Sequence, residues 1–213
     1  VLVRRYPGVH VAGGAARGWV GRRRVLGASY RASSLAVAGG RSAITGGLGG
    51  LGVRASRMLV DAGAPGIVLS SRSGCVTRDG QGLEAALTAM FNVAVVASSN
   101  SADAADVIAL FSATLITGVL HAAGTDDVGL LAQLDMARVQ SMCASKAFGA
   151  WYLQCAADTV PHEVCLLFTS VGSGLGSKGQ CSYAMGNACL DARALSRRAC
   201  GAAACAVQWP LIG

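Results

Sequence analysis

Short apolar runs alternate with longer segments of helical spacing from residue 41 onward. The apolar runs predict short buried strands at 43–45, 66–70, 93–97, 118–121, 164–168 and 204–209. The segments between them predict helices at 50–62, 81–90, 102–114, 135–157 and 183–200. This repeated order predicts an α/β fold, a doubly wound, Rossmann-like parallel sheet with right-handed crossovers and helices on both faces.

The composition agrees with one such domain. The chain has 213 residues, of which 53% are hydrophobic and only 5% aromatic, as expected where helices pack closely on a buried parallel sheet. The uncharged stretch 107–125 is interrupted by Ser112, Thr114, Gly118 and His121. A helix end followed by a strand explains this stretch better than a membrane span, so we expect no membrane partner.

Positive charge is concentrated near the N-terminus. Residues 1–60 hold ten arginines and no acid, whereas 61–213 hold more acidic than basic groups, within a net charge of +7. We interpret 1–40, which lacks periodicity, as a basic Gly/Ala/Arg-rich linker or the remnant of a preceding subdomain, and 41–213 as the folded domain. A transit-like segment is the alternative. Few aromatics interleave the arginines, so no nucleic-acid partner is expected. The first residue is Val1, which favours a fragment of a longer protein.

The eight cysteines lack the spacing of a metal site or a disulfide framework. No C-x-x-C pair occurs, and several cysteines lie in apolar runs such as Val164-Cys165-Leu166-Leu167, where a thiol acts as a small hydrophobe. The histidines are too scattered to form a ligand cluster. We therefore expect no metal and a reducing compartment, the cytoplasm, or a plastid if the N-terminal segment is a transit peptide.

A glycine-rich loop follows the first predicted strand. It comprises Thr45, Gly46, Gly47, Leu48, Gly49, Gly50, Leu51 and Gly52. Glycines allow a sharp turn into the next helix and let a pyrophosphate approach the backbone, where the helix N-terminus offers free N–H groups. A second strand ends about 20 residues later, as a dinucleotide-binding motif requires. The eight residues are therefore candidates for binding a dinucleotide cofactor.

The end of the second predicted strand favours a particular dinucleotide. An acidic residue there would hold a free ribose 2′-hydroxyl, but this chain has Ser71 and Arg72. A guanidinium with neighbouring hydroxyls suits a 2′-phosphate, which favours NADPH over NADH. The alternative is that Arg72 is an ordinary solvated surface arginine.

Ser170, Tyr183 and Lys146 are the candidate catalytic residues. Ser170 lies at the end of the fifth predicted strand, and the Gly- and Ser-rich segment 171–182 predicts a loop leading to a helix that begins at Tyr183. A free tyrosine has a pKa of about 10, and a nearby ammonium group favours its phenolate. Lys146, on the long helix before that strand, is the candidate to supply this charge. Lys178 is less suitable because it lies in the glycine-rich segment.

The chain resembles the ketoreductase domains of modular, type I polyketide synthases, a branch of the short-chain dehydrogenase/reductase superfamily. The resemblance covers residues 41–209. It rests on the glycine loop, Ser71-Arg72-Ser73-Gly74, Gly118-Val119-Leu120-His121-Ala122-Ala123-Gly124, Ser145-Lys146-Ala147-Phe148-Gly149-Ala150, Phe168-Thr169-Ser170, Tyr183-Ala184-Met185-Gly186-Asn187 and Leu190-Asp191. In most of the superfamily a lysine follows the tyrosine by four residues, and an asparagine occupies the earlier helix. Lys146 and Asn187 have exchanged these places, as in the ketoreductases, which argues against a discrete short-chain reductase.

The resemblance implies an activity for residues 41–213. NADPH would deliver hydride to the β-carbonyl carbon of an acyl chain carried on the phosphopantetheine arm of an acyl carrier protein, giving a β-hydroxyacyl thioester. Ser170 would bind the carbonyl oxygen, Tyr183 would donate the proton, and Lys146 would assist Tyr183 and hold the nicotinamide ribose. Asn187 would fix Lys146 and a proton-relay water. Neighbouring synthase domains in the same polypeptide would be further partners.

The resemblance extends the set of candidate cofactor-binding residues. The added positions are Ser99, His121, Ala122, Ala123 and Gly124, with Lys146 and Tyr183 from the catalytic group.

Some positions depart from the family pattern. Where the family has Cys-Asp for the adenine, this chain has Ser98-Ser99-Asn100, and the Leu-Asp-Asp stereochemical marker is matched only by Asp126 and Asp127, one position early. With Leu175 in place of the tryptophan of the opposite class, these positions lean toward a 3R alcohol. The chain ends at Gly213, before the family's substrate lid. A catalytically silent Rossmann-fold scaffold module of a polyketide or fatty acid synthase is therefore the alternative function.

Overall fold

The computed structural model describes residues 40–76, 81–125, 127–159, 164–176 and 178–210. The predicted N-terminal linker, apart from Gly40, lies outside these residues, as does Asp126.

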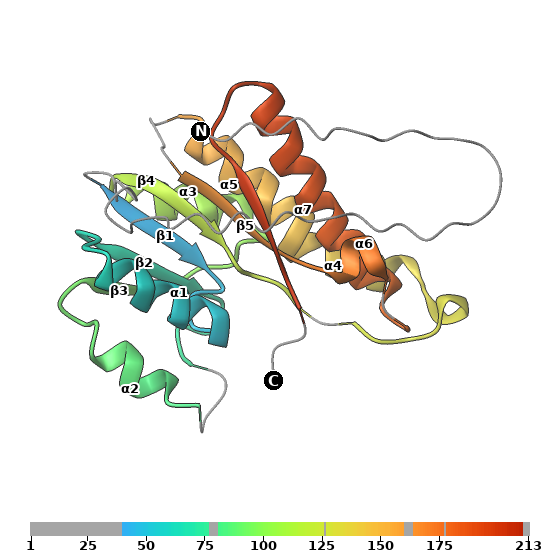
Figure 1. Ribbon diagram of the computed structural model, residues 1–213, viewed down its shortest axis with the longest axis horizontal. Helices are drawn as coiled ribbons and strands as arrows, with labels where there is room; N and C mark the ends of the chain where they lie inside the picture. Colours follow the sequence, from blue (N-terminus) through green and yellow to red (C-terminus); the bar gives the residue numbers. More distant parts are fainter. Residues whose placement is uncertain (1–39, 77–80, 126, 160–163, 177, 211–213) are drawn as a thin grey trace, which may run out of the picture. The chain divides into compact units, whose positions relative to one another are not determined.

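A parallel sheet of six strands forms the centre of the fold (Figure 1). The strands lie in the order β3-β2-β1-β4-β5-β6, and every neighbouring pair is parallel. Their bounds are β1 Arg41–Thr45, β2 Ile67–Ser71, β3 Ala94–Ser98, β4 Ile116–His121, β5 Val164–Ser170 and β6 Cys205–Trp209. The predicted doubly wound α/β fold is confirmed, because the order reverses between β1 and β4 as in Rossmann-like sheets.

Helices cover both faces of this sheet (Figure 1). Their bounds are α1 Gly50–Asp61, α2 Leu83–Thr88, α3 Ala104–Ser112, η2 Leu131–Gln133, α4 Met136–Cys143, η3 Ala144–Phe148, α5 Gly149–Ala157, α6 Gly172–Leu175 and α7 Cys181–Ala199. On one face, α1 and α2 pack on alternate strand residues such as Ile44 and Leu69. On the other face, α3, α5 and α7 pack on Ala43, Val119 and Leu167. Alternate residues of each strand therefore serve opposite cores.

Two predicted elements differ from the structure. The helix predicted at 135–157 is interrupted by a π-helical turn, η3, so that it comprises α4, η3 and α5. The prediction of a loop over 171–182 is wrong in part, because this segment contains the single turn α6 and the first residues of α7. Neither the π turn η3 nor the short helix α6 shows a periodic pattern of hydrophobic residues in the sequence. The turn of α6 is closed by backbone hydrogen bonds from Leu175 and Gly176 to Val171 and Gly172.

The cysteines occupy the surface more than the sequence predicts. All eight are free, and six are exposed, whereas Cys143 and Cys165 are partly buried. Cys165 packs beside the core formed by α5 and α7, as its apolar run predicts. The sequence predicts such packing only for cysteines inside apolar runs, and others, such as Cys155 and Cys189, are exposed on their helices. None of the described helices is both long and apolar enough to cross a membrane.

Candidate active site

The loop between β1 and α1 lies against the end of β4. Gly46 has a positive φ of 65°, and a Cβ atom there would lie 2.7 Å from the backbone nitrogen of Ala123. A Cβ at Gly52 would lie 2.4 Å from the carbonyl oxygen of Gly46, so only glycine lets the first turn of α1 approach the loop. The N-cap residue of α1, Gly49, has no side chain to satisfy the first-turn amides. These amides are therefore placed to bind an anion.

A cleft of about 290 Å³ opens at the carboxyl ends of β1 to β4, where the strand order reverses. Most of the predicted cofactor-binding residues line it: Thr45, Gly46, Leu48, Gly49, Ser71, Arg72, Ser99, Ala122, Ala123 and Gly124. Ser70, Ser73, Cys75, Asn100 and Ser101 also line it and are not among the predicted cofactor-binding residues. Their position beside the predicted strand ends is the signal that could have found them.

Other predicted residues of the glycine loop lie behind the cleft. Gly47 packs against the backbone of Ile44 and Leu69, and Leu51 packs on the core beneath α1. Gly50 and Gly52 belong to the first turn of α1 and do not line the cleft.

The wall of the cleft at β2 and β3 is polar and carries no carboxylate among its described lining residues. Arg72 is exposed at the end of β2, and its carbonyl oxygen accepts a hydrogen bond from the Ser98 hydroxyl at 3.1 Å. Ser71 Oγ accepts from the Gly74 amide at 3.1 Å, which fixes the turn that follows. The charge that this wall presents is therefore positive.

The segment 99–102 after β3 carries no charged side chain, although the Asn100 amide donates to the Asp106 carboxylate at 2.7 Å. The Asn100 side-chain oxygen accepts from the Ala102 amide at 3.1 Å, so it is used within its own turn. Ser99 Oγ is buried and has no hydrogen-bond partner among the residues that the structure describes. Since a buried hydroxyl without a partner is costly, Ser99 is the residue here that best fits a ligand contact.

His121 is a predicted cofactor-binding residue that does not reach the cleft. It is completely buried at the end of β4, and its Nδ1 lies 2.6 Å from the Thr45 hydroxyl. Burial, with a smaller effect of the Lys146 charge, lowers the pKa of His121 from 6.5 to about 4. The neutral imidazole therefore supports Thr45 and the loop from beneath. Its ring lies against the start of α5, where a Cβ atom at Gly149 would be 3.3 Å from it, and the motif alone does not reveal this contact.

Lys146 lies in the π-helical turn η3 and is buried. Its aliphatic chain runs close to Gly186, and a Cβ atom at Gly124 would lie 2.9 Å from Lys146 Nζ. The Nζ group donates to Asn187 Oδ1 at 3.0 Å and lies 5.3 Å from the centre of the Tyr183 ring. Because a π turn shifts the helix register, it directs Lys146 toward α7, and such turns are frequent at functional sites.

Asn187 joins the lysine to the tyrosine. It is fully buried one turn after Tyr183, and its Nδ2 donates to the Tyr183 carbonyl oxygen at 2.8 Å. The structure thus brings three of the four predicted catalytic residues together. The fourth, Ser170, ends β5, against which α7 packs, and its Oγ accepts from the Gly172 amide at 3.1 Å.

The loop after β4 is tied to the start of α7. Asp127 forms an ion pair with Arg138 and accepts a hydrogen bond from the hydroxyl of Ser182, the residue before Tyr183. The Ser182 hydrogen bond and then the Arg138 interaction lower the pKa of Asp127. Asp127 is therefore ionised and restrains the loop beside the candidate catalytic tyrosine.

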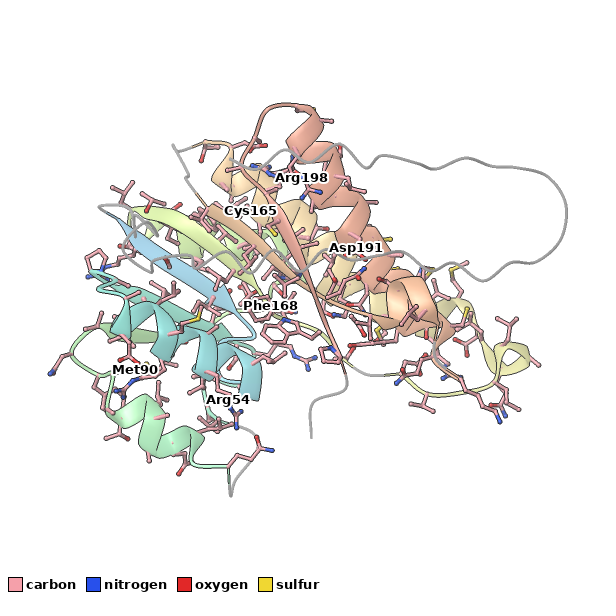
Figure 2. The ribbon with its side chains drawn as sticks, in the orientation of Figure 1. Arg54, Met90, Cys165, Phe168, Asp191 and Arg198 are labelled. Atoms are coloured by element: carbon pink, nitrogen blue, oxygen red, sulfur yellow. The ribbon has the colours of Figure 1, made fainter. Side chains whose placement is uncertain are left out.

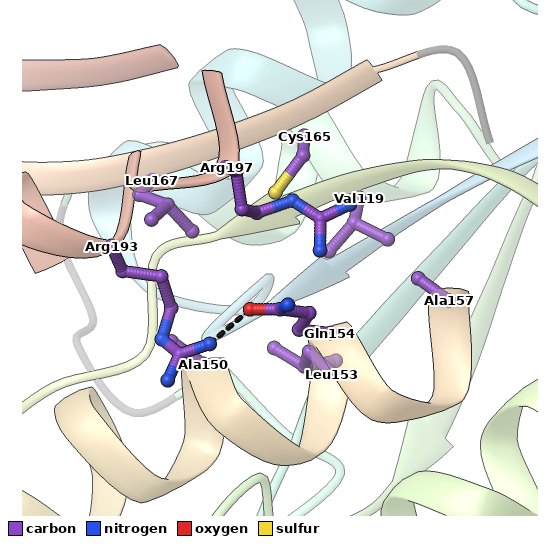
Figure 3. Close-up of a pocket in the computed structure, with 9 residues that line it drawn as sticks. All are labelled: Val119, Ala150, Leu153, Gln154, Ala157, Cys165, Leu167, Arg193 and Arg197. Atoms are coloured by element: carbon purple, nitrogen blue, oxygen red, sulfur yellow. Dashed lines mark hydrogen bonds between the residues drawn. The ribbon is translucent and has the colours of Figure 1, made fainter. Parts of the chain in front are cut away.

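A second cavity, beneath α5 and α7, is much smaller. Its volume is about 10 Å³, near the least that holds one water molecule. Arg193 bonds to Gln154 across it, over apolar side chains such as Leu153 and Leu167 (Figure 3). This cavity is a packing defect and not a ligand site.

Comparison with known proteins gives consistent similarities. The KR domain family matches residues 40–213. The chain is 39% identical over 170 residues to the polyketide synthase GfsB of Streptomyces halstedii, covering 78% of this chain and 3% of that protein. It is 37% identical over 187 residues to the 6-methylsalicylic acid synthase of Aspergillus terreus, covering 78% of this chain and 10% of that protein. The chain thus spans a small part of these relatives.

Solved structures agree. An A-type ketoreductase from a modular polyketide synthase matches with a TM-score of 0.72 and 33% identity, over 80% of this chain and 37% of that one. The first ketoreductase of the tylosin polyketide synthase matches with a TM-score of 0.72 and 32% identity, over 82% of this chain and 39% of that one.

Proposed function

Since the chain belongs to the ketoreductase domains of polyketide synthases, in the short-chain dehydrogenase/reductase superfamily, we propose that it reduces a β-ketoacyl thioester on an acyl carrier protein with NADPH. The product is the β-hydroxyacyl thioester. The observation that carries this proposal is the buried Lys146, held by Asn187 and facing the Tyr183 ring. The proposed partners are the acyl carrier protein and the neighbouring domains of a longer synthase.

The cleft fits a nicotinamide dinucleotide. Its glycine turn and uncapped helix N-terminus suit a pyrophosphate, and Gly46 keeps this turn against the backbone of Ala122 and Ala123, where a side chain would clash. When bound, the dinucleotide supplies the hydride for the carbonyl carbon. Thr45, Gly46 and Gly49 would hold the phosphates, and Ala122, Ala123 and Gly124 would border the nicotinamide half.

The choice of NADPH rests on charge. Arg72 stands at the rim between Ser71 and Ser73, and the described cleft residues include no carboxylate to repel a 2′-phosphate. A guanidinium binds a phosphate through two charge-assisted hydrogen bonds.

The polar residues of the site have complementary roles. Ser170 Oγ accepts from the Gly172 amide, which leaves its O–H group to donate to the substrate carbonyl oxygen. Tyr183 donates the proton that this oxygen takes up, and the ammonium group of Lys146 stabilises the phenolate that remains. Asn187 holds Lys146 in place while its Nδ2 group fixes the backbone of Tyr183.

NADPH oxidation with a β-ketoacyl pantetheine thioester tests the proposal. The Tyr183→Phe variant should lose activity by about 100-fold or more, because it removes the proton donor. Tyr152→Phe is the matched control, since Tyr152 packs on the core beneath α5. Equal activity of Tyr183→Phe and the wild type would refute the role of Tyr183.

The neutral segment at Ser99 and Asn100 favours one alternative, a scaffold module that binds cofactor weakly and does not catalyse. In that case the folded protein would show no turnover of the thioester in the presence of saturating NADPH.

A further inference from the structure

Asp191 lies on α7, about two turns after Tyr183, and faces the strands (Figure 2). Its Oδ2 atom is 2.6 Å from Ser173 Oγ and 2.8 Å from Gln208 Nε2. Gln208 Nε2 is also 3.0 Å from Ser173 Oγ. One carboxylate oxygen therefore joins α7 to α6, which contains Ser173, and to β6, which contains Gln208.

The hydroxyl proton of Ser173 has two acceptors within reach. Ser170 O is 2.8 Å from Ser173 Oγ, and Asp191 Oδ2 is closer and charged. Charge-assisted hydrogen bonds are roughly twice as strong as neutral ones, so Ser173 donates mainly to Asp191 while Gln208 donates to both. The other oxygen, Oδ1, is buried without a hydrogen-bond partner in the described part of the chain. A half-buried carboxylate with one oxygen unsatisfied is costly, so its contacts with Ser173 and Gln208 need a local reason.

This carboxylate acts on the turn that holds Ser170. Ser173 follows Ser170 by three residues, and between them the Gly172 amide donates to Ser170 Oγ at 3.1 Å. The helix α6 is one turn long, contains two glycines and has no side-chain cap. Glycine disfavours a helix, and a single turn is not stable by itself. The hydrogen bond from Ser173 to Asp191 therefore stabilises this turn, which has no side-chain cap of its own.

We propose that Asp191 is a positioning residue for Ser170, acting through Ser173. It fixes α6 so that the Gly172 amide occupies one lone pair of Ser170 Oγ, and the O–H group is directed to the substrate oxygen. This inference rests on the proposed reductase function and adds a residue that touches neither substrate nor cofactor.

A double-mutant cycle on the full chain tests this coupling. Asp191→Ala should lower kcat by about 10-fold or more, as losses of supporting partners do, with an unchanged Kd for NADPH. Asp191→Asn should recover most of the loss, because its amide oxygen still accepts from Ser173 and Gln208. In the Ser170→Ala background, Asp191→Ala should cause no further loss of kcat. Asp61→Asn, at a surface ion pair on α1, is the carboxylate control.

The same loss in both backgrounds would overturn the proposal, because Asp191 would then act independently of Ser170. An unchanged kcat in Asp191→Ala would overturn it as well.

Hydrogen exchange provides a readout that does not need turnover. In Asp191→Ala the amides of Gly172, Gly174 and Gly176 should exchange about 10-fold faster, while those of α1 stay protected. Asp191→Asn should exchange like the wild type. Unchanged protection of α6 would refute the positioning role even if the enzyme were active. If neither the wild type nor any variant turns over the thioester, the proposed reductase function fails. The hydrogen-exchange rates of α6 then decide by themselves whether Asp191 holds this turn.

Discussion

The position of the Lys146 ammonium group is set by small neighbours. Gly124 and Gly186 leave room for its chain, and Asn187 accepts from Nζ at 3.0 Å. A buried charge requires such a partner, since desolvation is expensive. The exchange of lysine and asparagine between two helices can be predicted from the sequence. The contact of Lys146 with Gly124 cannot, because Gly124 is 22 residues distant in the chain.

Gly124→Ala tests this arrangement. The new Cβ would lie 2.9 Å from Nζ, so the flexible end of Lys146 must shift from its present position beside Asn187 and Tyr183. We expect a drop in kcat of about 10-fold or more at saturating NADPH, with little change in stability. Equal kcat values for Gly124→Ala and the wild type would show that the position of Nζ is unimportant.

His121 should make stability depend on pH. The pKa of His121 is about 4 in the folded protein and 6.5 in the unfolded chain. Above pH 6.5 the imidazole is neutral in both states, and burying it costs no free energy of protonation. Stability is lost as pH falls from 6.5 toward 4, by about 3 kcal/mol in total. Urea unfolding across this range should show a weaker pH dependence for His121→Gln than for the wild type. Identical slopes would mean that His121 is protonated equally in both states.

At the scale of elements, the sequence predicts the regular parts and misses the local departures. All six strands follow from apolar runs, and the structure extends β4 back to Ile116 and β5 forward to Ser170. The π turn at Lys146 and the short α6 have no periodic signal, since each depends on contacts with α7 that only the fold creates.

The link between the loop after β4 and α7 is testable by titration. Ser182→Ala removes the hydrogen bond that contributes most to the lowered pKa of Asp127, so this pKa should rise toward its ordinary value. Carboxyl NMR of the two proteins would measure the change. Ser112→Ala, whose hydroxyl donates to the Ile108 carbonyl oxygen on α3, is the hydroxyl control. An unchanged Asp127 titration in Ser182→Ala would mean that the Arg138 ion pair alone sets it.

At the scale of the molecule, the reversal of strand order explains where the cleft lies. The glycine loop and the strand ends, and hence most of the cleft, are predictable from the sequence because they are local patterns. The contacts of Asp127 with Ser182 and of Asp191 with Ser173 and Gln208 are not, since each joins residues that are distant along the chain. The motif at the end of β4 predicts a cofactor contact for His121, but the fold buries this side chain completely.

Dinucleotide preference is a property of the whole cleft. Arg72→Ala should weaken NADPH binding by about 10- to 100-fold, the value of a charge-assisted hydrogen bond, and change NADH binding little. Cofactor fluorescence would give both Kd values. Arg57→Ala is the control, because Arg57 pairs with Asp61 on the outer face of α1. Equal losses for both cofactors would show that Arg72 does not contact the 2′-phosphate.

Transfer of a labelled hydride tests the central claim most directly. The full chain would be incubated with a β-ketoacyl pantetheine thioester and NADPH deuterated at the nicotinamide C4 position, and the product examined by mass spectrometry and NMR. We predict a β-hydroxyacyl thioester that carries one deuterium on the β-carbon, and none from the Tyr183→Phe variant. An unreduced thioester, with NADPH bound to the folded wild type, would contradict the reductase function and support a scaffold module.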